Sequence, residues 1–291
     1  MDKVHVVLNP TADRNQAGKR EGEIRAALDQ ARVEFTLDRT EGPGHATELA
    51  ARAAAAGAQC VVAAGGDGTV NEVAQSLMGT DTALGIIPVG SGNDYVRALG
   101  IERDVAAAAR RIARARARAV DVGRAAGRYY LNSLGMGIDG QIAKDYGRLR
   151  FLHGETGYLL TTILEIIRFR PFSVIVEADG WSYSGQILTA AVMNGPFAGG
   201  GFHLAPEALL DDGLLDVSLL GNYGRLVRFA VLPRTRDGSY LRLKRVHARR
   251  TRNFAIRADR PVPVHVDGEL LPETVAELCV ELCPGALQVV V

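Results

Sequence analysis

The stretch CVVAAGGDGTVNEV, residues 60–73, decides the fold that we expect for this chain. It opens with an apolar run (residues 60–64), passes through glycines that surround the carboxylate of Asp67, and continues with a helical pattern. Thr69 and Glu72 have the spacing of a capping box, which predicts that the helix begins at Thr69. A glycine loop before a helix presents free N–H groups and therefore predicts a phosphate site. A tight turn before a capped helix is the alternative, because glycine and aspartate are also turn residues.

A second loop of the same design, PVGSGND, covers residues 88–94 and also ends in a carboxylate, Asp94. Neither loop has the G-x-G-x-x-G fingerprint of dinucleotide sites or the lysine of a P-loop, so Mg²⁺ beside Asp67 is the natural counter-charge for a phosphate. Loops that follow neighbouring parallel strands meet at the carboxyl edge of the sheet, where ligands bind. The two loops together indicate a phosphate site more strongly than either alone.

The two halves of the chain have different patterns. Up to Asp121, strands and helices alternate, which predicts a Rossmann-like parallel α/β domain with helices on both faces of its sheet. The segments after it are strand-like with short turns, which predicts an antiparallel β-sandwich. The predicted strands are residues 4–8, 34–38, 60–64, 83–88, 129–133, 173–178, 186–193, 215–220, 241–247, 253–257 and 262–266, and the predicted helices are residues 18–31, 45–56, 69–78, 94–99, 104–119 and 157–169.

Composition narrows the class of protein. The chain has 291 residues and a net charge of +1 at pH 7, so no overall field favours nucleic acid. No apolar run reaches the roughly 18 residues of a membrane span, and the run at the N-terminus is too short for a signal peptide, so we expect a cytoplasmic protein without a transmembrane segment. Cys60, Cys279 and Cys283 lack disulfide or zinc spacing and are expected to pack as small buried residues.

Further motifs accompany the two loops. They are Asn9-Pro10, Thr40 ahead of His45-Ala46, GGG at 199–201, PEALLDDGLLDV at 206–217 and VDGE at 266–269. In this order they resemble the diacylglycerol kinase catalytic-domain family, which includes bacterial lipid kinases, sphingosine kinases and ceramide kinases. The DDGLLD and DGE segments are the specific ones, whereas the glycine-aspartate loop is shared with NAD kinases.

The resemblance implies a fold and two cofactors, ATP and Mg²⁺. It implies a nucleotide-binding α/β domain at residues 1–124, to which the tail 284–291 returns, and a β-sandwich domain at residues 125–283. ATP is then expected against one set of residues, which are Thr40, Gly65, Gly66, Asp67, Gly68, Thr69, Val70, Asn71 and Ser91. The family more often has threonine than serine at position 91, but a hydroxyl is kept.

The resemblance also implies catalytic residues. Asp267 is the expected general base, because it lies in an Asp-Gly turn that we predict to push it outward, and a lipid hydroxyl that attacks the γ-phosphate needs an acceptor. Asp67, Asp94 and, as an open third member, Asp121 would hold the catalytic Mg²⁺ through waters. For Asp267 the alternative is a hairpin corner, since Asp-Gly is a common hairpin dipeptide.

A second, structural Mg²⁺ is implied in the β domain. Asp212 and the backbone carbonyls of Leu209 and Leu214 would be its ligands, a set that suits a hard cation. An acidic turn without metal is the alternative, because Asp-Gly turns are common.

The function expected from these residues is transfer of the ATP γ-phosphoryl group to a lipid hydroxyl, on a diacylglycerol-like or sphingoid substrate. A soluble kinase of the NAD kinase type and a non-catalytic nucleotide- or lipid-binding regulator remain alternatives, and so does a homodimer. The lipid would be met at a membrane surface. Two segments could touch anionic head groups: the apolar helix at residues 157–169, flanked by Arg148, Arg150, Arg168 and Arg170, and the basic stretch 234–252. A core helix and a solvated strand edge are the alternatives.

Overall fold

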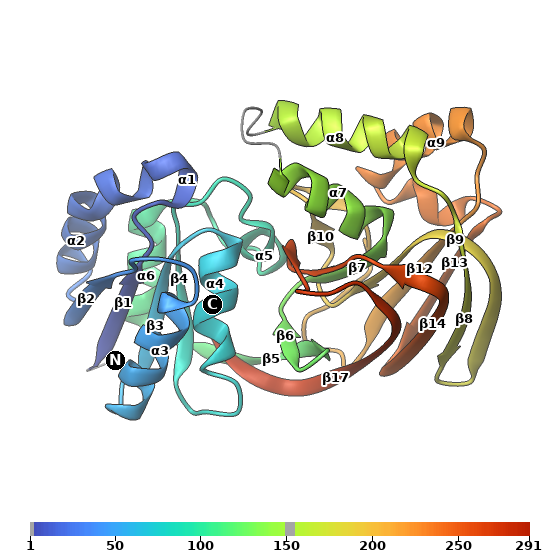
Figure 1. The fold of residues 1–291 in the computed structure, drawn as a ribbon. Helices are drawn as coiled ribbons and strands as arrows, with labels where there is room; N and C mark the ends of the chain where they lie inside the picture. Colours follow the sequence, from blue (N-terminus) through green and yellow to red (C-terminus); the bar gives the residue numbers. More distant parts are fainter. Residues whose placement is uncertain (1–2, 149–154) are drawn as a thin grey trace. The chain divides into compact units, whose positions relative to one another are not determined.

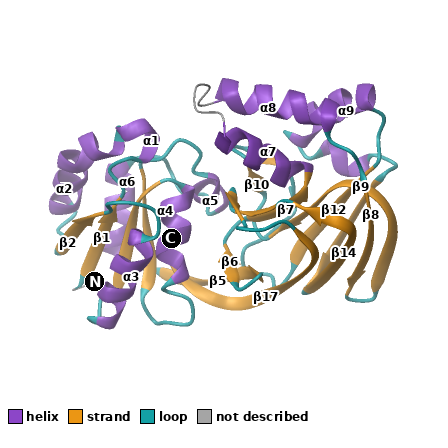
Figure 2. Ribbon diagram, in the orientation of Figure 1, coloured by secondary structure: helices purple, strands orange, loops and turns teal. Residues whose placement is uncertain are grey.

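The computed structural model describes residues 3–148 and 155–291. Contacts divide the chain into two compact units, Met1–Val122 with Cys283–Val291 and Gly123–Leu282. The first unit is a parallel α/β domain and the second is an antiparallel β-sandwich, so the predicted fold class is confirmed (Figures 1 and 2). Of the expected membrane-docking residues, Arg150 and the side chain of Arg148 lie outside what the structure describes.

The first unit is built on a parallel sheet with the strand order β17-β4-β3-β1-β2. Its strands are β1 Val4–Leu8, β2 Phe35–Arg39, β3 Cys60–Gly65, β4 Ala83–Pro88 and the end of β17 Val275–Val290. Val289 of β17 pairs with Leu84, so the C-terminus adds a strand to this sheet. Every residue of β3 and β4 is buried, as expected for parallel strands that are covered on both faces.

Helices cover both faces of this sheet. The helical segments are α1 Ala12–Asn15, η1 Ala17–Arg20, α2 Glu21–Gln30, α3 His45–Ala55, α4 Asp67–Gln75, α5 Asp94–Ala98 and α6 Val105–Arg114. Helices α2 and α6 pack together over one set of alternating strand residues, among them Val6 and Val62. The intervening residues Val7 and Val61 are also fully buried, because side chains alternate between the faces of a strand and α3 and α4 pack on the other side.

The second unit is an antiparallel sandwich. Its strands are β6 Arg128–Tyr130, β7 Ser133–Gly137, β8 Phe172–Ala178, β9 Trp181–Met193, β12 Leu215–Gly221, β13 Val246–Thr251, β14 Asn253–Val262, β15 Val264–Val266 and β16 Glu269–Leu270, with a separate hairpin of β10 Phe197–Ala198 and β11 Phe202–His203. The start of β9 pairs with β8 and its end pairs with β7 and β12, so this one long strand connects both layers. Met136, Phe172 and Phe254 belong to the core between the layers.

Three helices lie together on one side of this unit (Figure 1). They are α7 Ile138–Arg148, α8 Glu155–Arg168 and α9 Arg225–Val231, and the short helices η2 Leu232–Thr235 and η3 Ser239–Arg242 follow α9. The sequence predicted only α8. Helix α7 contains Gly140 and Gly147, which lower helix propensity, so its packing against α8 and β15 decides its structure.

Several predicted boundaries were wrong. The helix predicted at 104–119 ends at Arg114, because Ala115 adopts the left-handed conformation and strand β5 (Ala117–Ala125) begins after it. The strand predicted at 129–133 is divided between β6 and β7, and the one predicted at 241–247 begins only at Val246. Cys60 is buried as predicted, but Cys279 is exposed on β17, which alternates between buried and exposed residues at that point.

Candidate active site

The two glycine loops of the first unit touch through their backbones. They follow β3 and β4, which pair in parallel, and Val89 donates its N–H to Gly65 O at 3.2 Å. A Cβ atom on Gly90 would lie only 2.2 Å from Gly66 Cα, so the second loop cannot carry a side chain at Gly90, and a Cβ on Gly66 would lie 3.3 Å from Gly90 Cα, a tight contact. The close approach of the two loops therefore requires glycine at position 90.

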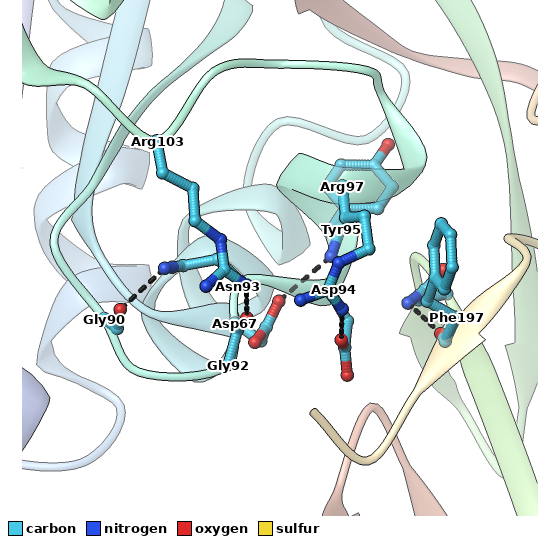
Figure 3. Close-up of polar contacts among 10 residues, drawn as sticks. Asp67, Gly90, Gly92, Asn93, Asp94, Tyr95, Arg97, Arg103 and Phe197 are labelled. Atoms are coloured by element: carbon cyan, nitrogen blue, oxygen red, sulfur yellow. Dashed lines mark hydrogen bonds and ion pairs between the residues drawn. The ribbon is translucent and has the colours of Figure 1, made fainter. Parts of the chain in front are cut away.

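The Asp67 carboxylate joins the first loop to the second. Its Oδ1 accepts the N–H of Tyr95 at 3.1 Å (Figure 3). The backbone N–H groups of Asn93 and Asp94 also donate to the Asp67 carboxylate. A Cβ on Gly92 would lie 2.7 Å from Asp67 Oδ2, so this glycine is needed as well. Asp67 thus holds the N-terminus of α5, a role that the sequence alone did not reveal because the partners are 28 residues apart.

The electrostatics of Asp67 indicate a place for a cation. Burial raises the pKa of the Asp67 carboxyl above its ordinary value, the N–H of Tyr95 opposes that rise, and the negative charge of Asp94 adds to it. Arg97 pairs with Asp94 Oδ1 at 2.6 Å. Asn93 Oδ1 is buried and has no hydrogen-bond donor among the described residues. Carboxylate and amide oxygens are the ligands that Mg²⁺ prefers, so these residues fit the ion.

The helix after the first loop begins earlier than predicted. Helix α4 starts at Asp67, with Gly66 as its N-cap and no side-chain cap. Thr69 Oγ1 instead accepts a hydrogen bond from Asn9 Nδ2 at 3.0 Å, and Glu72 Oε2 accepts the N–H of Ala46 at 3.2 Å. The capping box was therefore wrong, because tertiary partners take both side chains. The first helical hydrogen bond runs from Val70 N to Gly66 O, so the amides before it have no acceptor in the helix, as phosphate binding requires.

The remaining residues expected around ATP lie at the same edge of the sheet or on α4. Thr40 follows β2 and donates its N–H to Leu8 O at 2.8 Å. Ser91 is exposed, and its hydroxyl donates to Asp13 Oδ1 at 2.8 Å. Val70 and Asn71 are buried on α4, and Asn71 Oδ1 accepts from Gln75 Nε2 at 3.0 Å.

Two residues that the sequence analysis did not name also lie at the second loop. Arg103 donates to the carbonyl of Gly92, and Arg97 pairs with Asp94 (Figure 3). The only signal for Arg97 was its i,i+3 spacing from Asp94, which is common on helices. Together they place positive charge at the second loop.

Asp121 has a partner elsewhere in the first unit. Its carboxylate is buried, and Oδ1 accepts the N–H of Gly285 at 2.8 Å. This bond fastens the returning C-terminal segment to β5. Any contact of Asp121 with Mg²⁺ stays a prediction.

Asp267 lies in the second unit, in the turn between β15 and β16, with a positive φ of 47°. Its side chain does not point away from the protein as predicted. The carboxylate accepts three backbone N–H groups, from Leu131 at 2.7 Å, Asn132 at 2.9 Å and Ser133 at 2.8 Å. These donors fix the position of the carboxylate oxygens in space.

The predicted structural metal site is arranged differently from a simple Mg²⁺ cage. Asp212 Oδ1 accepts the N–H of Leu214 at 3.1 Å, and Oδ2 pairs with the guanidinium of Arg250, which also reaches Asp216 at 3.4 Å. Leu209 is largely exposed. A guanidinium thus already supplies the positive charge, and a metal at Asp212 would have to displace it. As they stand, these residues do not fit the ion.

The described part of the chain contains no cluster of three or more His, Cys, Asp or Glu side chains that could hold a metal. Because of this, a bound Mg²⁺ would depend on water and on amide or backbone oxygens besides its carboxylates.

Within the described residues, no helix combines the length and apolar composition of a membrane span.

Comparison with known proteins agrees with this arrangement. Residues 3–125 match the family model of the diacylglycerol kinase catalytic domain, and residues 132–291 match the YegS C-terminal NAD kinase beta sandwich-like domain. The chain belongs to the diacylglycerol kinase family of phosphotransferases. The resemblance inferred from the motifs is thereby confirmed.

Relatives of the family match over most of their length. The chain is 31% identical to the diacylglycerol kinase of Bacillus subtilis (strain 168), with 92% of this chain and 90% of the relative covered. It is 32% identical to a "Probable lipid kinase YegS-like" of Pseudomonas fluorescens, with the same coverage. Among solved structures, a candidate diacylglycerol kinase from Bacillus anthracis str. Sterne superimposes with a TM-score of 0.82 at 26% identity, covering 99% of this chain and 96% of that one.

Proposed function

We propose that this protein is an ATP- and Mg²⁺-dependent lipid kinase that phosphorylates a hydroxyl of a diacylglycerol-like or sphingoid lipid. The observation that carries the proposal is the backbone contact of Gly66 with Gly90, which joins two glycine loops and the N-termini of two helices. The printed names of the relatives, diacylglycerol kinase and lipid kinase, support a lipid as acceptor.

The first unit would bind the nucleotide. The amides of residues 65–69 are suited to the phosphates, with the hydroxyls of Thr40 and Ser91 as further contacts. Asp67, Asp94 and the free Asn93 Oδ1 would hold Mg²⁺, which when bound neutralises charge on the phosphates and on the group in transfer. Arg97 and Arg103 add positive charge near the loops, which lack the lysine of a P-loop.

Asp267 would accept the proton of the substrate hydroxyl. The hydroxyl oxygen forms the new bond to the γ-phosphorus, the bond from that phosphorus to the β–γ bridging oxygen breaks, and ADP leaves. The hydroxyl proton passes to the Asp267 carboxylate. Because three backbone N–H groups orient this carboxylate, the acceptor is fixed before the substrate arrives.

The test is transfer of ³²P from labelled ATP, with Mg²⁺, to a panel of diacylglycerol, monoacylglycerol, ceramide and sphingosine in detergent micelles. We expect a labelled lipid, and loss of labelling in Asp67→Asn and Asp267→Asn. The matched controls Asp81→Asn and Asp259→Asn change exposed carboxylates and should keep full activity.

The same assay distinguishes the alternatives. NAD⁺ in the panel tests the kinase of the NAD kinase type, whose name the second family model shares. Formation of NADP⁺ without any labelled lipid would replace the proposal with that alternative. ATP binding without transfer to any acceptor would favour a non-catalytic regulator.

A further inference from the structure

Helix α8 exposes three of its apolar side chains, whereas its Ile166 belongs to the core of the second unit. Leu159, Leu160 and Ile167 are 50%, 40% and 42% exposed, whereas Thr161 and Glu165 are buried at 2% and 8% exposure. Amphipathic helices of soluble proteins normally bury the apolar stripe, so a core helix, the alternative left open by the sequence, does not account for these three exposed residues. The buried hydroxyl of Thr161 is satisfied by the carbonyl of Gly157 at 2.8 Å.

Helix α9 exposes apolar side chains as well. Leu226 is 86% exposed, Val227 47% and Phe229 39%. The arginine between them, Arg228, turns inward and is buried. An exposed apolar set of this size on two adjacent helices is unusual for a monomeric surface and marks an interaction site.

Arg228 fastens α9 to α8. Its Nη1 donates to Ile166 O at 3.0 Å and to Phe169 O at 2.8 Å, and its Nε donates to Tyr223 O at 2.9 Å. The guanidinium thus satisfies carbonyls at the C-terminal end of α8. The two helices therefore form one platform, and both lie on the same side of the second unit (Figure 1). The platform is defined here by the exposed apolar residues Leu159, Leu160, Ile167, Leu226, Val227 and Phe229.

The described exposed charges of segments 156–170 and 222–236 are all positive. Helix α8 contains two acids: Glu155, whose side chain lies outside what the structure describes, and Glu165, which is turned inward and lies against Asp145. Segment 222–236 contains none. These exposed cations are Arg168, Arg170, Arg225, Arg234 and Arg236. Exposed apolar side chains with exposed arginines in the same segments complement a lipid interface that carries anionic head groups.

The second basic segment of the sequence analysis, residues 234–252, is a weaker candidate. Arg250 is paired with Asp212 and Asp216, Arg249 lies over the ring of Trp181 at 5.6 Å, and Arg245 lies over Tyr223 at 5.6 Å. These side chains are engaged within the protein. These contacts favour the alternative for residues 234–252, a solvated strand edge.

We propose that the α8–α9 platform docks on anionic lipid bilayers, with the apolar residues entering the interface and the arginines contacting head groups. A second copy of the chain is the less favourable occupant, because a symmetric contact would bring the same arginines of both copies together. The inference rests on exposure and charge and holds whether or not the proposed kinase reaction is correct.

The test is sedimentation with vesicles of phosphatidylcholine alone and of phosphatidylcholine mixed with phosphatidylglycerol, without ATP. We expect binding to the anionic vesicles that weakens with salt, and a loss of about tenfold in Leu160→Gln/Leu226→Gln. Arg225→Gln should lose about fivefold. The matched control is Ile175→Gln on β8, where an isoleucine 53% exposed lies outside the platform and should leave binding unchanged.

The proposal is overturned if the protein does not prefer anionic vesicles, or if Ile175→Gln weakens binding as much as the platform variant. Light scattering after gel filtration tests the other possible occupant of the platform, a second copy of the chain. A wild-type dimer that becomes monomeric in Leu160→Gln/Leu226→Gln would assign the platform to a second copy. Because both leucines are exposed, an unchanged thermal midpoint is expected and shows that the variant is folded.

Discussion

The Cα of Gly66 and a Cβ built on Gly90 would be 2.2 Å apart, so the two loops that end β3 and β4 cross in direct backbone contact. Each loop precedes a helix, and Asp67 of the first accepts the N–H of Tyr95 in the second. A change in one loop must therefore displace the other. This coupling makes the two loops one structural unit.

Gly90→Ala tests that contact. A methyl group there must displace the Gly66 backbone, so we expect a loss of about 1–3 kcal/mol in the free energy of unfolding and a larger loss of ATP affinity. Urea denaturation and nucleotide titration measure the two effects. Gly22→Ala is the control, because no atom lies within 4 Å of its added Cβ and it sits in helix α2, where alanine should stabilise. Normal ATP binding by Gly90→Ala would contradict the shared site.

Asp67→Asn separates stability from function. Burial raises the pKa of Asp67 above 3.8, so between 3.8 and the raised value the folded state holds a proton that the unfolded chain has released. Stability therefore falls as pH rises through that window, and the asparagine variant lacks this slope. We expect it to be at least as stable as the wild type at neutral pH, without Mg²⁺ or nucleotide, yet inactive. If urea denaturation gives the same dependence of unfolding free energy on pH for the wild type and for Asp67→Asn, the raised pKa of Asp67 is not the source of this slope.

His265 gives the opposite pH dependence. Burial lowers its pKa from 6.5 to about 4, and its unprotonated Nδ1 accepts the N–H of Gly268 at 3.3 Å, beside Asp267. Between 6.5 and about 4 the unfolded chain binds a proton that the folded state excludes, so stability falls as pH falls, by roughly 3 kcal/mol at most.

The measurement for His265 is the free energy of unfolding across that pH range in the wild type and in His265→Gln. The variant should lose this part of the acid-side slope, even if it is less stable at every pH. Replacement of the half-exposed His247 by glutamine is the control and should keep the slope. A His265→Gln profile parallel to that of the wild type would exclude the neutral imidazole of His265 as the source of the slope.

The ion pair of Arg250 with Asp212 bears on whether the turn at Asp212 binds a metal. Burial raises the pKa of Asp216, and the charge of Arg250 opposes that rise, so the guanidinium serves two carboxylates at once. We expect the thermal midpoint of the wild type to be independent of Mg²⁺ in the absence of nucleotide, and Arg250→Gln to be less stable and to gain a Mg²⁺-dependent shift. A wild-type shift that disappears in Asp212→Asn would instead support the metal site implied by the family.

Much of the first unit could be predicted because its signals are local. Apolar runs such as residues 60–64, followed by glycine and a helical pattern, indicate a buried parallel strand and a turn without knowledge of distant partners. The antiparallel half was predicted in class but less well in its boundaries. Helix α9 was missed because it has only 7 residues and its apolar residues, RLVRFAV, do not show a helical period over that length.

The sequence by itself determined the fold class, the family and the identity of the chemistry-bearing residues, since glycine, aspartate and their order along the chain are properties of local segments. Only the tertiary structure decided what those side chains contact. Asp67 holds the start of α5, Asp267 is bound by the backbone of residues 131–133, and Arg250 pairs with Asp212. These partners are 28, 135 and 38 residues apart, and such pairings arise from long-range packing that local propensity does not specify.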